Sequence, residues 1–199
     1  MKRIITFFIV VLLFASIPLF AKGSTLISAG HDITFPMYED FGDVFRGDLV
    51  ASFATVGAYD GGVGFYNFNS LRVPFYIYDK DFGFSKVDLS KDLDLYLSTI
   101  TGLDVVLPIG STLEVILGVG AWVEVDYMKD DDFLFMYAGP AARADLVFNI
   151  SRNFFLDFGV EAQYMLYLMF YDLESKEYDA GPVKEFSYPS CGLRFGIRI

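Results

Sequence analysis

The chain has 199 residues and a formal net charge of -11, with 22 Phe, 13 Tyr and 18 Gly but only seven Pro. This length fits one domain, and the acidity excludes nucleic acid as an expected partner. The balance of aromatic residues and glycine against proline favours strands and turns over helices.

The first 21 residues have the pattern of a secretory signal peptide. Lys2 and Arg3 precede an apolar run from Phe7 to Ala15, and the segment IPLFA ends at the small residue Ala21, which suits signal peptidase. A single anchoring helix is the alternative, but the apolar run is shorter than the roughly 20 residues that span a bilayer. We therefore expect a signal peptide at 1–21 and one folded domain at 22–199. Loss of the two positive charges of Lys2 and Arg3 would take the net charge from -11 to -13.

Alternating apolar and polar segments, bounded by turn residues, predict eight strands after the signal peptide. They run roughly over 24–35, 48–59, 63–78, 93–108, 112–128, 133–150, 154–171 and 187–199. The connections after the second, fourth and sixth strands are tight and contain DGG, IGS and SRN, whereas those after the first, third and seventh are longer and polar. Such alternation is typical of a membrane barrel with short periplasmic turns, long external loops and both termini on the periplasmic side.

The seventh of these segments, FFLDFGVEAQYMLYLMFY, shows most clearly which environment the strands require. At a period of two, one set of positions from Phe154 to Phe170 has no charge, while the other set contains Asp157 and Glu161. A strand sends each set to its own side, and nine successive apolar positions suit a tilted strand that crosses lipid. The remaining apolar runs are too short for a membrane helix, so a closed barrel is the expected way to satisfy the backbone in a bilayer.

The two faces of the predicted strands differ in the same way along the chain. If the charged face points inward, nearly all strand glycines lie inside, where they would make room for bulky residues such as Tyr66, Tyr96 and Trp122. Bulges or bends are the alternative role for these glycines. The outward sets are apolar, for example Leu193, Phe195 and Ile197 near the C-terminus, although His31 also falls on the outward face.

These features predict an all-β protein, an eight-stranded antiparallel up-and-down transmembrane β-barrel that occupies residues 22–199. The alternative is a secreted soluble barrel of the lipocalin type, which would have apolar residues inside and charges outside. The position of Gly159 on the same face as Asp157 and Glu161 argues against that alternative.

With its signal peptide, its eight strands and its final segment SCGLRFGIRI, the chain resembles the small outer-membrane β-barrel proteins, the OmpA-barrel, OmpX and OmpW-like group. The resemblance implies a location in the bacterial outer membrane, contact with its lipid, and insertion by the barrel assembly machinery, which reads the last strand. Leu193, Phe195 and Ile197 match the alternating pattern of that strand in the family, whereas the final Ile199 departs from the usual aromatic residue.

A lumenal ion pair is predicted between the sixth and seventh strands. If SRN is a three-residue turn, Arg143 lies directly across from Glu161 on the inward face. Further inward charges would extend this pair into a network that fills the lumen, with Arg72, Asp145 and Asp157 as its main members and Asp104, Glu114, Glu124, Asp126, Arg194 and Arg198 around them.

Above the ion pair, the inward positions become apolar. This gallery of side chains comprises Trp122, Phe135, Tyr137, Met165 and Tyr167, with Phe133, Met169, Tyr76, Tyr78 and Tyr96 as further candidates. One interpretation is a binding site or entry path for a small hydrophobic molecule, as the OmpW-like resemblance suggests. The other is that the strands project beyond the bilayer and these side chains pack on one another, since the longest strands exceed the path across an apolar band about 25 Å tall.

No catalytic pattern supports an enzyme. The single histidine faces outward, no metal-ligand spacing or glycine loop is present, and Cys191 is the only cysteine, so we expect no cofactor and no metal. A surface acyltransferase of the kind found among small outer-membrane barrels, and weak cation binding at Asp130–Asp132, are the less favoured alternatives. The favoured function is a structural or surface-interaction role with an extracellular partner at the loops. The alternatives are a narrow channel or binding barrel for a small hydrophobic ligand and, less favoured, a secreted carrier.

Overall fold

The computed structural model describes residues 23–35, 44–57, 62–88, 94–129 and 132–199. Its strands are β1 (Gly23–Thr34), β2 (Val44–Gly57), β3 (Val63–Asp79), β4 (Gly83–Lys86), β5 (Leu95–Ile109), β6 (Leu113–Met128), β7 (Phe133–Asn149), β8 (Phe154–Asp172) and β9 (Tyr178–Arg198). Within the described ranges, no helix is long and apolar enough to cross a membrane. The predicted signal peptide at 1–21, most of the DGG turn, and Asp130 and Asp131 lie outside the described residues.

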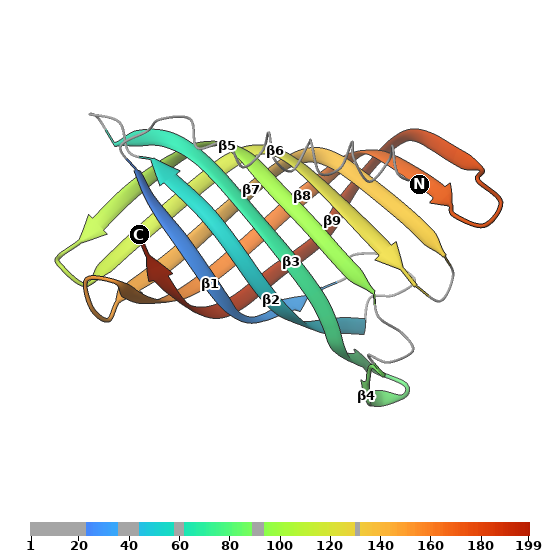
Figure 1. Ribbon diagram of the computed structural model, residues 1–199, viewed down its shortest axis with the longest axis horizontal. Helices are drawn as coiled ribbons and strands as arrows, with labels where there is room; N and C mark the ends of the chain where they lie inside the picture. Colours follow the sequence, from blue (N-terminus) through green and yellow to red (C-terminus); the bar gives the residue numbers. More distant parts are fainter. Residues whose placement is uncertain (1–22, 36–43, 58–61, 89–93, 130–131) are drawn as a thin grey trace.

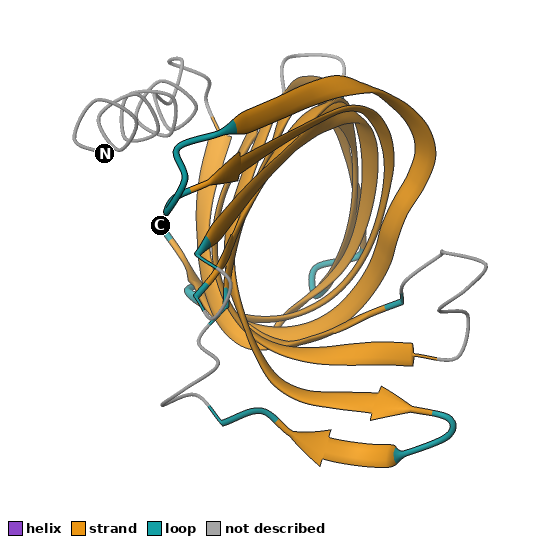
Figure 2. Ribbon diagram, turned by 90° about the vertical axis from the view of Figure 1, so that its right-hand side faces the viewer, coloured by secondary structure: helices purple, strands orange, loops and turns teal. Residues whose placement is uncertain are grey.

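Eight of the strands close into an antiparallel ring that follows chain order, and β4 pairs with β3 at the end of the sheet order (Figure 1). The ring closes because β9 pairs with β1, from Leu26 opposite Arg198 to Thr34 opposite Ser190. Figure 2 shows this ring of strands from one end. The predicted eight-stranded up-and-down barrel is therefore confirmed.

The two mouths of the barrel differ as the turn pattern predicts. At one mouth the start of β1 meets the end of the chain after β9, where Thr25 and Ile199 exchange backbone hydrogen bonds of 3.1 and 2.9 Å. The turns after β5 and β7 are at this mouth; Gly110 adopts a φ of 69° in the first, and Ser151 accepts a hydrogen bond from the Phe154 amide in the second. We call this the periplasmic mouth, following the predicted orientation, and the opposite end, which carries the β3–β4 and β8–β9 hairpins, the outer mouth.

Two strands begin earlier than predicted. β2 begins at Val44 and not at 48, and β9 begins at Tyr178 and not at 187, because Tyr178 already pairs with Tyr171 of β8. Gly181 and Pro182 favoured a loop in the sequence. Proline is compatible with this part of β9 because, in the described structure, β9 pairs there with β8 on one side and reaches β1 only at Ser190.

The two faces of the wall have the predicted polarity. On β8, the side chains of Phe158 and Val160 are each 44% exposed on the outside, whereas Asp157 and Glu161 are 6% and 1% exposed inside. The interior also buries the aromatic side chains Tyr66 and Trp122. Charges inside and apolar residues outside are the reverse of a soluble lipocalin-type barrel, so that alternative is excluded.

Several of the inward glycines leave room for large neighbours. A Cβ at Gly118 would lie 2.8 Å from the ring of Tyr66, and one at Gly159 would overlap Nη2 of Arg143. At Gly102 and Gly120, by contrast, the added atom would meet the backbone of the paired strand. Some lumenal glycines therefore leave room for the large side chains that fill the interior, and others allow neighbouring strands to approach closely.

Candidate functional site in the barrel interior

Three arginines from three separate strands meet in the middle of the lumen. Arg72 of β3, Arg143 of β7 and Arg194 of β9 are all buried, and each contacts buried carboxylates. The carboxylates of this charged layer come from β1, β6, β7 and β8, and they are Asp32, Glu124, Asp145, Asp157 and Glu161. All five residues of the predicted network, Arg143, Glu161, Arg72, Asp157 and Asp145, lie in this layer.

Arg143 uses its guanidinium on two neighbours at once. Its Nη1 donates to Glu161 at 3.0 Å, and its Nε and Nη2 donate to the two oxygens of Asp145 at 3.0 and 2.5 Å. Glu161 stands opposite Arg143 in the register of β7 and β8, as the short turn between these strands predicted. The forked contact with Asp145 matches the planar geometry in which arginine binds carboxylates most strongly.

Arg72 connects strands that are not neighbours in the ring. Its Nη1 donates to Glu124 of β6 at 3.2 Å, and its Nη2 donates to Glu161 of β8 at 3.1 Å. Since β3 pairs with β2 and β5 in the ring, these contacts extend across the lumen and do not follow the wall. Arg72 therefore acts as a cross-brace between opposite sides of the barrel.

Arg194 completes the layer beside the closing seam of the barrel. Its Nη2 donates to Asp32 of β1, and its Nη1 lies 3.6 Å from Asp157. The ring of Phe68 stacks under both this guanidinium, at 5.2 Å, and that of Arg143, at 3.9 Å. Such cation–π contacts stabilise arginines that have been removed from water.

Two further ion pairs lie toward the mouths. Arg46 of β2 donates to Asp48 at 2.7 and 3.1 Å and lies 3.7 Å above the ring of Tyr96, on the outer side of the layer. At the periplasmic mouth, Arg198 binds both oxygens of Glu114 at 2.7 and 2.6 Å. Sequence reasoning missed Arg46 because the second strand was predicted to begin only at Asp48. It also omitted Asp32, although the parity of β1 places that residue inward.

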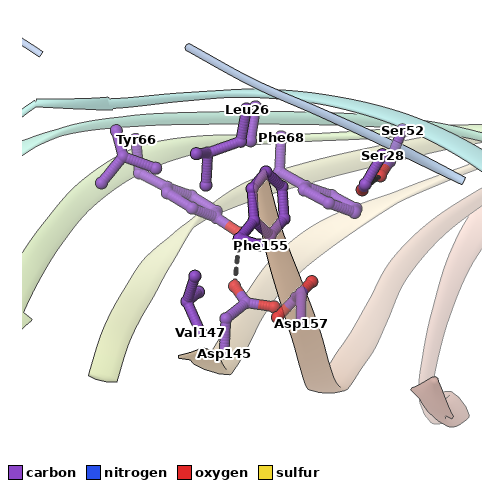
Figure 3. Close-up of a pocket in the computed structure, with 11 residues that line it drawn as sticks. Leu26, Ser28, Ser52, Tyr66, Phe68, Asp145, Val147, Phe155 and Asp157 are labelled. Atoms are coloured by element: carbon purple, nitrogen blue, oxygen red, sulfur yellow. Dashed lines mark hydrogen bonds between the residues drawn. The ribbon is translucent and has the colours of Figure 1, made fainter. Parts of the chain in front are cut away.

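On the periplasmic side of the charged layer the lumen is filled by aromatic and aliphatic side chains. Figure 3 shows Tyr66 pointing toward Asp145, where its hydroxyl donates a hydrogen bond of 3.4 Å, with Phe68 and Phe155 beside it. The hollow that these residues line measures about 10 Å³. That volume holds about one water molecule, so the interior at this level is packed.

Carboxylic groups outnumber guanidiniums in the interior. Among the described residues, the buried carboxylic groups are those of Asp32, Asp48, Asp104, Glu124, Asp126, Asp145, Asp157 and Glu161, whereas the fully buried guanidiniums are those of Arg72, Arg143 and Arg194, with the partly exposed Arg46 beside Asp48. An enclosed excess of carboxylates repels anions and attracts cations.

The predicted apolar gallery is present in part. Trp122 and Tyr137 stack with ring centroids 6.2 Å apart, Tyr137 stacks with Phe135 at 6.3 Å, and Met165 is buried beside them. The indole nitrogen of Trp122 donates to Ser98 at 3.1 Å. These four predicted gallery residues pack on one another above the charged layer.

The prediction for Tyr167 is wrong. Between Ala141, which pairs with Gln163, and Ala138, which pairs with Tyr167, β8 contains one residue more than β7. This β-bulge reverses the faces of β8, so that Tyr167 is 43% exposed and pairs with an outward position. Met169 is reversed as well, and Leu168 and Phe170 take the inward positions, where Phe170 contacts Phe133 at 4.7 Å.

A second bulge corrects the predictions for Tyr76 and Tyr78. Gly47 pairs with Tyr76 but Asp48 pairs with Pro74, so Phe75 is the extra residue in β3. Beyond it, Tyr76 stacks with the outward His31 at 5.6 Å, and Tyr78 stacks with Phe45 at 4.6 Å. His31 thus lies on the outer surface as predicted, among aromatic rings. Tyr96, in contrast, is buried in the lumen.

Beside the gallery, the reversed part of β8 and the start of β9 enclose an open hollow of about 210 Å³ at the outer mouth. Its lining comprises Leu168, Phe170, Asp179, Ala180, Gly181, Pro182 and Val183. Among the described residues, no group of three or more His, Cys, Asp and Glu side chains is arranged to hold a metal ion.

Comparison with known proteins finds similar structures but no matching sequence. No family model and no curated protein matches the chain. Among solved structures, the chain is similar to Neisserial surface protein A (NspA), with a TM-score of 0.51 at 13% identity, covering 89% of this chain and 96% of that one. It is also similar to the outer membrane protein OprG from Pseudomonas aeruginosa, with a TM-score of 0.54 at 10% identity over 89% and 96% of the two chains. A third similar structure is that of Ail, the attachment invasion locus protein of Yersinia pestis, determined in complex with the heparin analogue sucrose octasulfate, with a TM-score of 0.50 at 12% identity over 89% and 99%.

At these identities the likeness shows a shared fold. The chain has the fold of the small eight-stranded outer-membrane barrels, as the resemblance of its sequence predicted. The predicted location in the bacterial outer membrane agrees with this fold and with the apolar outer wall of the barrel.

Proposed function

We propose that the protein is a closed outer-membrane barrel with a structural or surface-interaction role, in which the charged layer seals the lumen. The observation that carries this proposal is the cross-brace of Arg72, which extends from β3 to Glu161 of β8 on the opposite side of the lumen and also binds Glu124 of β6. Packed aromatic side chains on the periplasmic side of the layer, around a hollow of about 10 Å³, support the same conclusion. A filled lumen suits a protein that acts through its outer surface.

Among the described outer loops, the hairpin of β8 and β9 carries a cluster of acidic residues. Asp172, Glu174, Glu177 and Asp179 lie in or beside its turn, with Lys176 as the basic residue among them. Tyr178 in the same turn is 74% exposed. A partner for this hairpin would carry basic groups and an apolar contact, and so would differ in charge from the polyanion named in the Ail structure.

Planar-bilayer conductance of the refolded protein tests the closed barrel. We expect no steady single-channel current from the wild-type protein. Arg72→Ala removes the cross-brace and should produce rare openings selective for cations, because the carboxylates of the layer stay in place. A large, steady current through the wild-type protein would contradict the proposal.

The alternative function, binding of a small hydrophobic molecule, is favoured by one observation. The open hollow of about 210 Å³ has Leu168, Phe170 and Val183 in its lining. Phe135, Leu168 and Val183 also pack on the apolar cluster that contains Trp122. A titration of the Trp122 fluorescence with hydrophobic ligands tests this function; a saturable change that is lost in Leu168→Asp supports it, and no saturable change rejects it.

Biogenesis through a signal peptide and the barrel assembly machinery belongs to the same proposal. Leu193, Phe195 and Ile197 of β9 are exposed on the outer wall in the alternating pattern of a sorting strand. N-terminal sequencing of the protein extracted from outer membranes should give a chain that begins after Ala21. Ile199→Phe, which restores a terminal aromatic residue, should raise the yield of folded barrel.

A further inference from the structure

The β3–β4 hairpin stands outside the ring of strands. Figures 1 and 2 show it leaving the wall at the outer mouth, away from the β8–β9 hairpin. Its tip presents two of the most exposed aromatic side chains of the described structure, Phe82 at 89% and Phe84 at 72% exposure. Burial in the barrel does not account for apolar groups so accessible, which usually mark a contact surface.

The tip is a turn that is held by hydrogen bonds from backbone amides to a side-chain carboxylate. The Asp79 carboxylate accepts hydrogen bonds from the amides of Asp81 and Phe82, at 2.7 and 3.2 Å, and Gly83 adopts a φ of 75° that a side chain would disfavour. Ladder pairing then places Phe84 opposite Tyr78. The local sequence DKDFG therefore holds Phe82 and Phe84 away from the barrel interior.

A continuous path of aromatic rings joins this tip to the lipid-facing wall. Phe84 contacts Tyr78 at 4.8 Å and Tyr76 at 5.9 Å, and Tyr76 in turn stacks on His31 of β1. Gly47 makes this possible, since a Cβ there would overlap the ring of Tyr76. The bulge at Phe75 turns Tyr76 and Tyr78 outward, so the apolar wall extends without a break onto the hairpin.

From this continuity, the geometry points to a lateral anchor: the β3–β4 hairpin inserts Phe82 and Phe84 into the interfacial region of the outer leaflet beside the barrel. The inference rests on the barrel standing in a bilayer, as its fold requires. Membrane barrels carry girdles of aromatic side chains at both interfaces, and an apolar phenylalanine ring can be buried at the boundary between headgroups and acyl chains. Lys80 and Lys86 are mixed with Asp79, Asp81 and Asp88 along the hairpin. Its contact with lipid is therefore apolar and independent of lipid charge.

Single-tryptophan variants of the full chain test the anchor, because Trp122 is the only tryptophan. In the Trp122→Phe background, Phe82→Trp is the test, Phe158→Trp on the outer wall is the lipid-facing control, and Tyr178→Trp on the β8–β9 turn is the water-facing control. Each protein is reconstituted in vesicles whose lipids carry bromine near the carbonyl end of the acyl chain, and is also titrated with acrylamide. If Trp122→Phe does not fold, cysteines labelled with an environment-sensitive dye in the Cys191→Ser background report on the same three positions.

For insertion by about 5–10 Å, we expect brominated lipid to quench the Phe82→Trp variant by about half, and acrylamide to quench it roughly threefold less than the Tyr178→Trp variant. The result should be the same in zwitterionic and in anionic vesicles.

Three other outcomes are distinguishable. If acrylamide quenches Phe82→Trp as strongly as Tyr178→Trp and brominated lipid does not quench it, the hairpin lies in water and the anchor is refuted. Protection of Phe82→Trp from both quenchers would show that protein, such as a second copy, covers the hairpin, which also refutes the anchor. Absence of lipid quenching in Phe158→Trp would show that the barrel itself is not in the bilayer, which overturns the anchor together with its premise.

Discussion

Arg143 illustrates how single residues determine the state of the interior, because it satisfies Asp145 and Glu161 at the same time. Arg143→Ala would leave both carboxylates buried without this cation, which should destabilise the barrel by about 3–5 kcal/mol. Glu161→Ala combined with Arg143→Ala should lower stability by less than the sum of the single changes, with a coupling of about 0.5–3 kcal/mol. Urea unfolding in vesicles, and the heat resistance of the folded band on gels, measure these differences.

Arg198→Ala is the matched control for that experiment. The Arg198 and Glu114 side chains are 21% and 20% exposed at the periplasmic mouth, where water can replace the lost contact. The loss of stability should therefore be smaller than for Arg143→Ala. Additive effects of Arg143→Ala and Glu161→Ala would show that the pair is not coupled. An equal loss in Arg198→Ala would show that burial does not set the cost of losing an arginine.

A substitution at Gly159 tests whether the side chains around Arg143 are packed as tightly as their distances indicate. A Cβ there would overlap Nη2 of Arg143 and lie 2.6 Å from Oδ1 of Asp145, so Gly159→Ala must displace this contact. We expect a loss of about 1–3 kcal/mol in the urea unfolding free energy. Gly181→Ala, whose Cβ would meet nothing within 4 Å, should be neutral. Equal behaviour of the two variants would mean that the charged layer is loosely packed.

The Arg143–Glu161 pairing could be predicted from the sequence because a short turn fixes the register of two neighbouring strands. The partners of Arg72 could not be predicted in this way. They depend on how far each strand is shifted as the sheet closes, and this shift is a property of the whole ring. Arg46 was missed for a simpler reason: the sequence around it has the polar composition of a loop.

At the scale of the elements, β8 shows where the alternation of apolar and polar residues no longer predicts which face a residue occupies. From Tyr164 to Tyr171 every residue is apolar, so the extra residue that reverses the strand leaves no trace in the alternation. The pattern therefore predicts the faces correctly up to Met165 and wrongly for Tyr167. The same reasoning applies to β3, where Phe75, Tyr76 and Tyr78 are all aromatic across the bulge.

Arginine substitutions along the outer face of β8 should reveal how much of this strand lies in lipid. With a rise of about 3.3 Å per residue and a tilt near 45°, Val160 lies close to the middle of an apolar band about 25 Å tall that begins near Phe154. Val160→Arg should therefore destabilise the barrel by about 2–4 kcal/mol, and Tyr167→Arg, near the interface, by about 0–1 kcal/mol. Tyr178→Arg, at the exposed turn, is the control without a lipid contact. Unfolding in vesicles gives the order of the three losses in stability. A larger loss for Tyr167→Arg than for Val160→Arg would show that the assumed position of the bilayer along β8 is wrong.

At the scale of the whole molecule, buried ion pairs and exposed acidic groups should respond differently to salt. The ion pairs of the charged layer are buried, so dissolved ions cannot screen them, whereas the exposed acidic groups repel one another through water. Raising the ionic strength from about 0.05 M to about 1 M shortens the screening length severalfold, which relieves that repulsion and leaves the interior unchanged. The urea midpoint of the barrel in zwitterionic vesicles should therefore stay constant or rise slightly. Sodium chloride is the salt to use, because sulfate strengthens apolar burial by itself. A midpoint that falls steadily with salt would mean that the arginine–carboxylate contacts are open to solvent, and a barrel with a solvated charged layer would have a water path through its lumen.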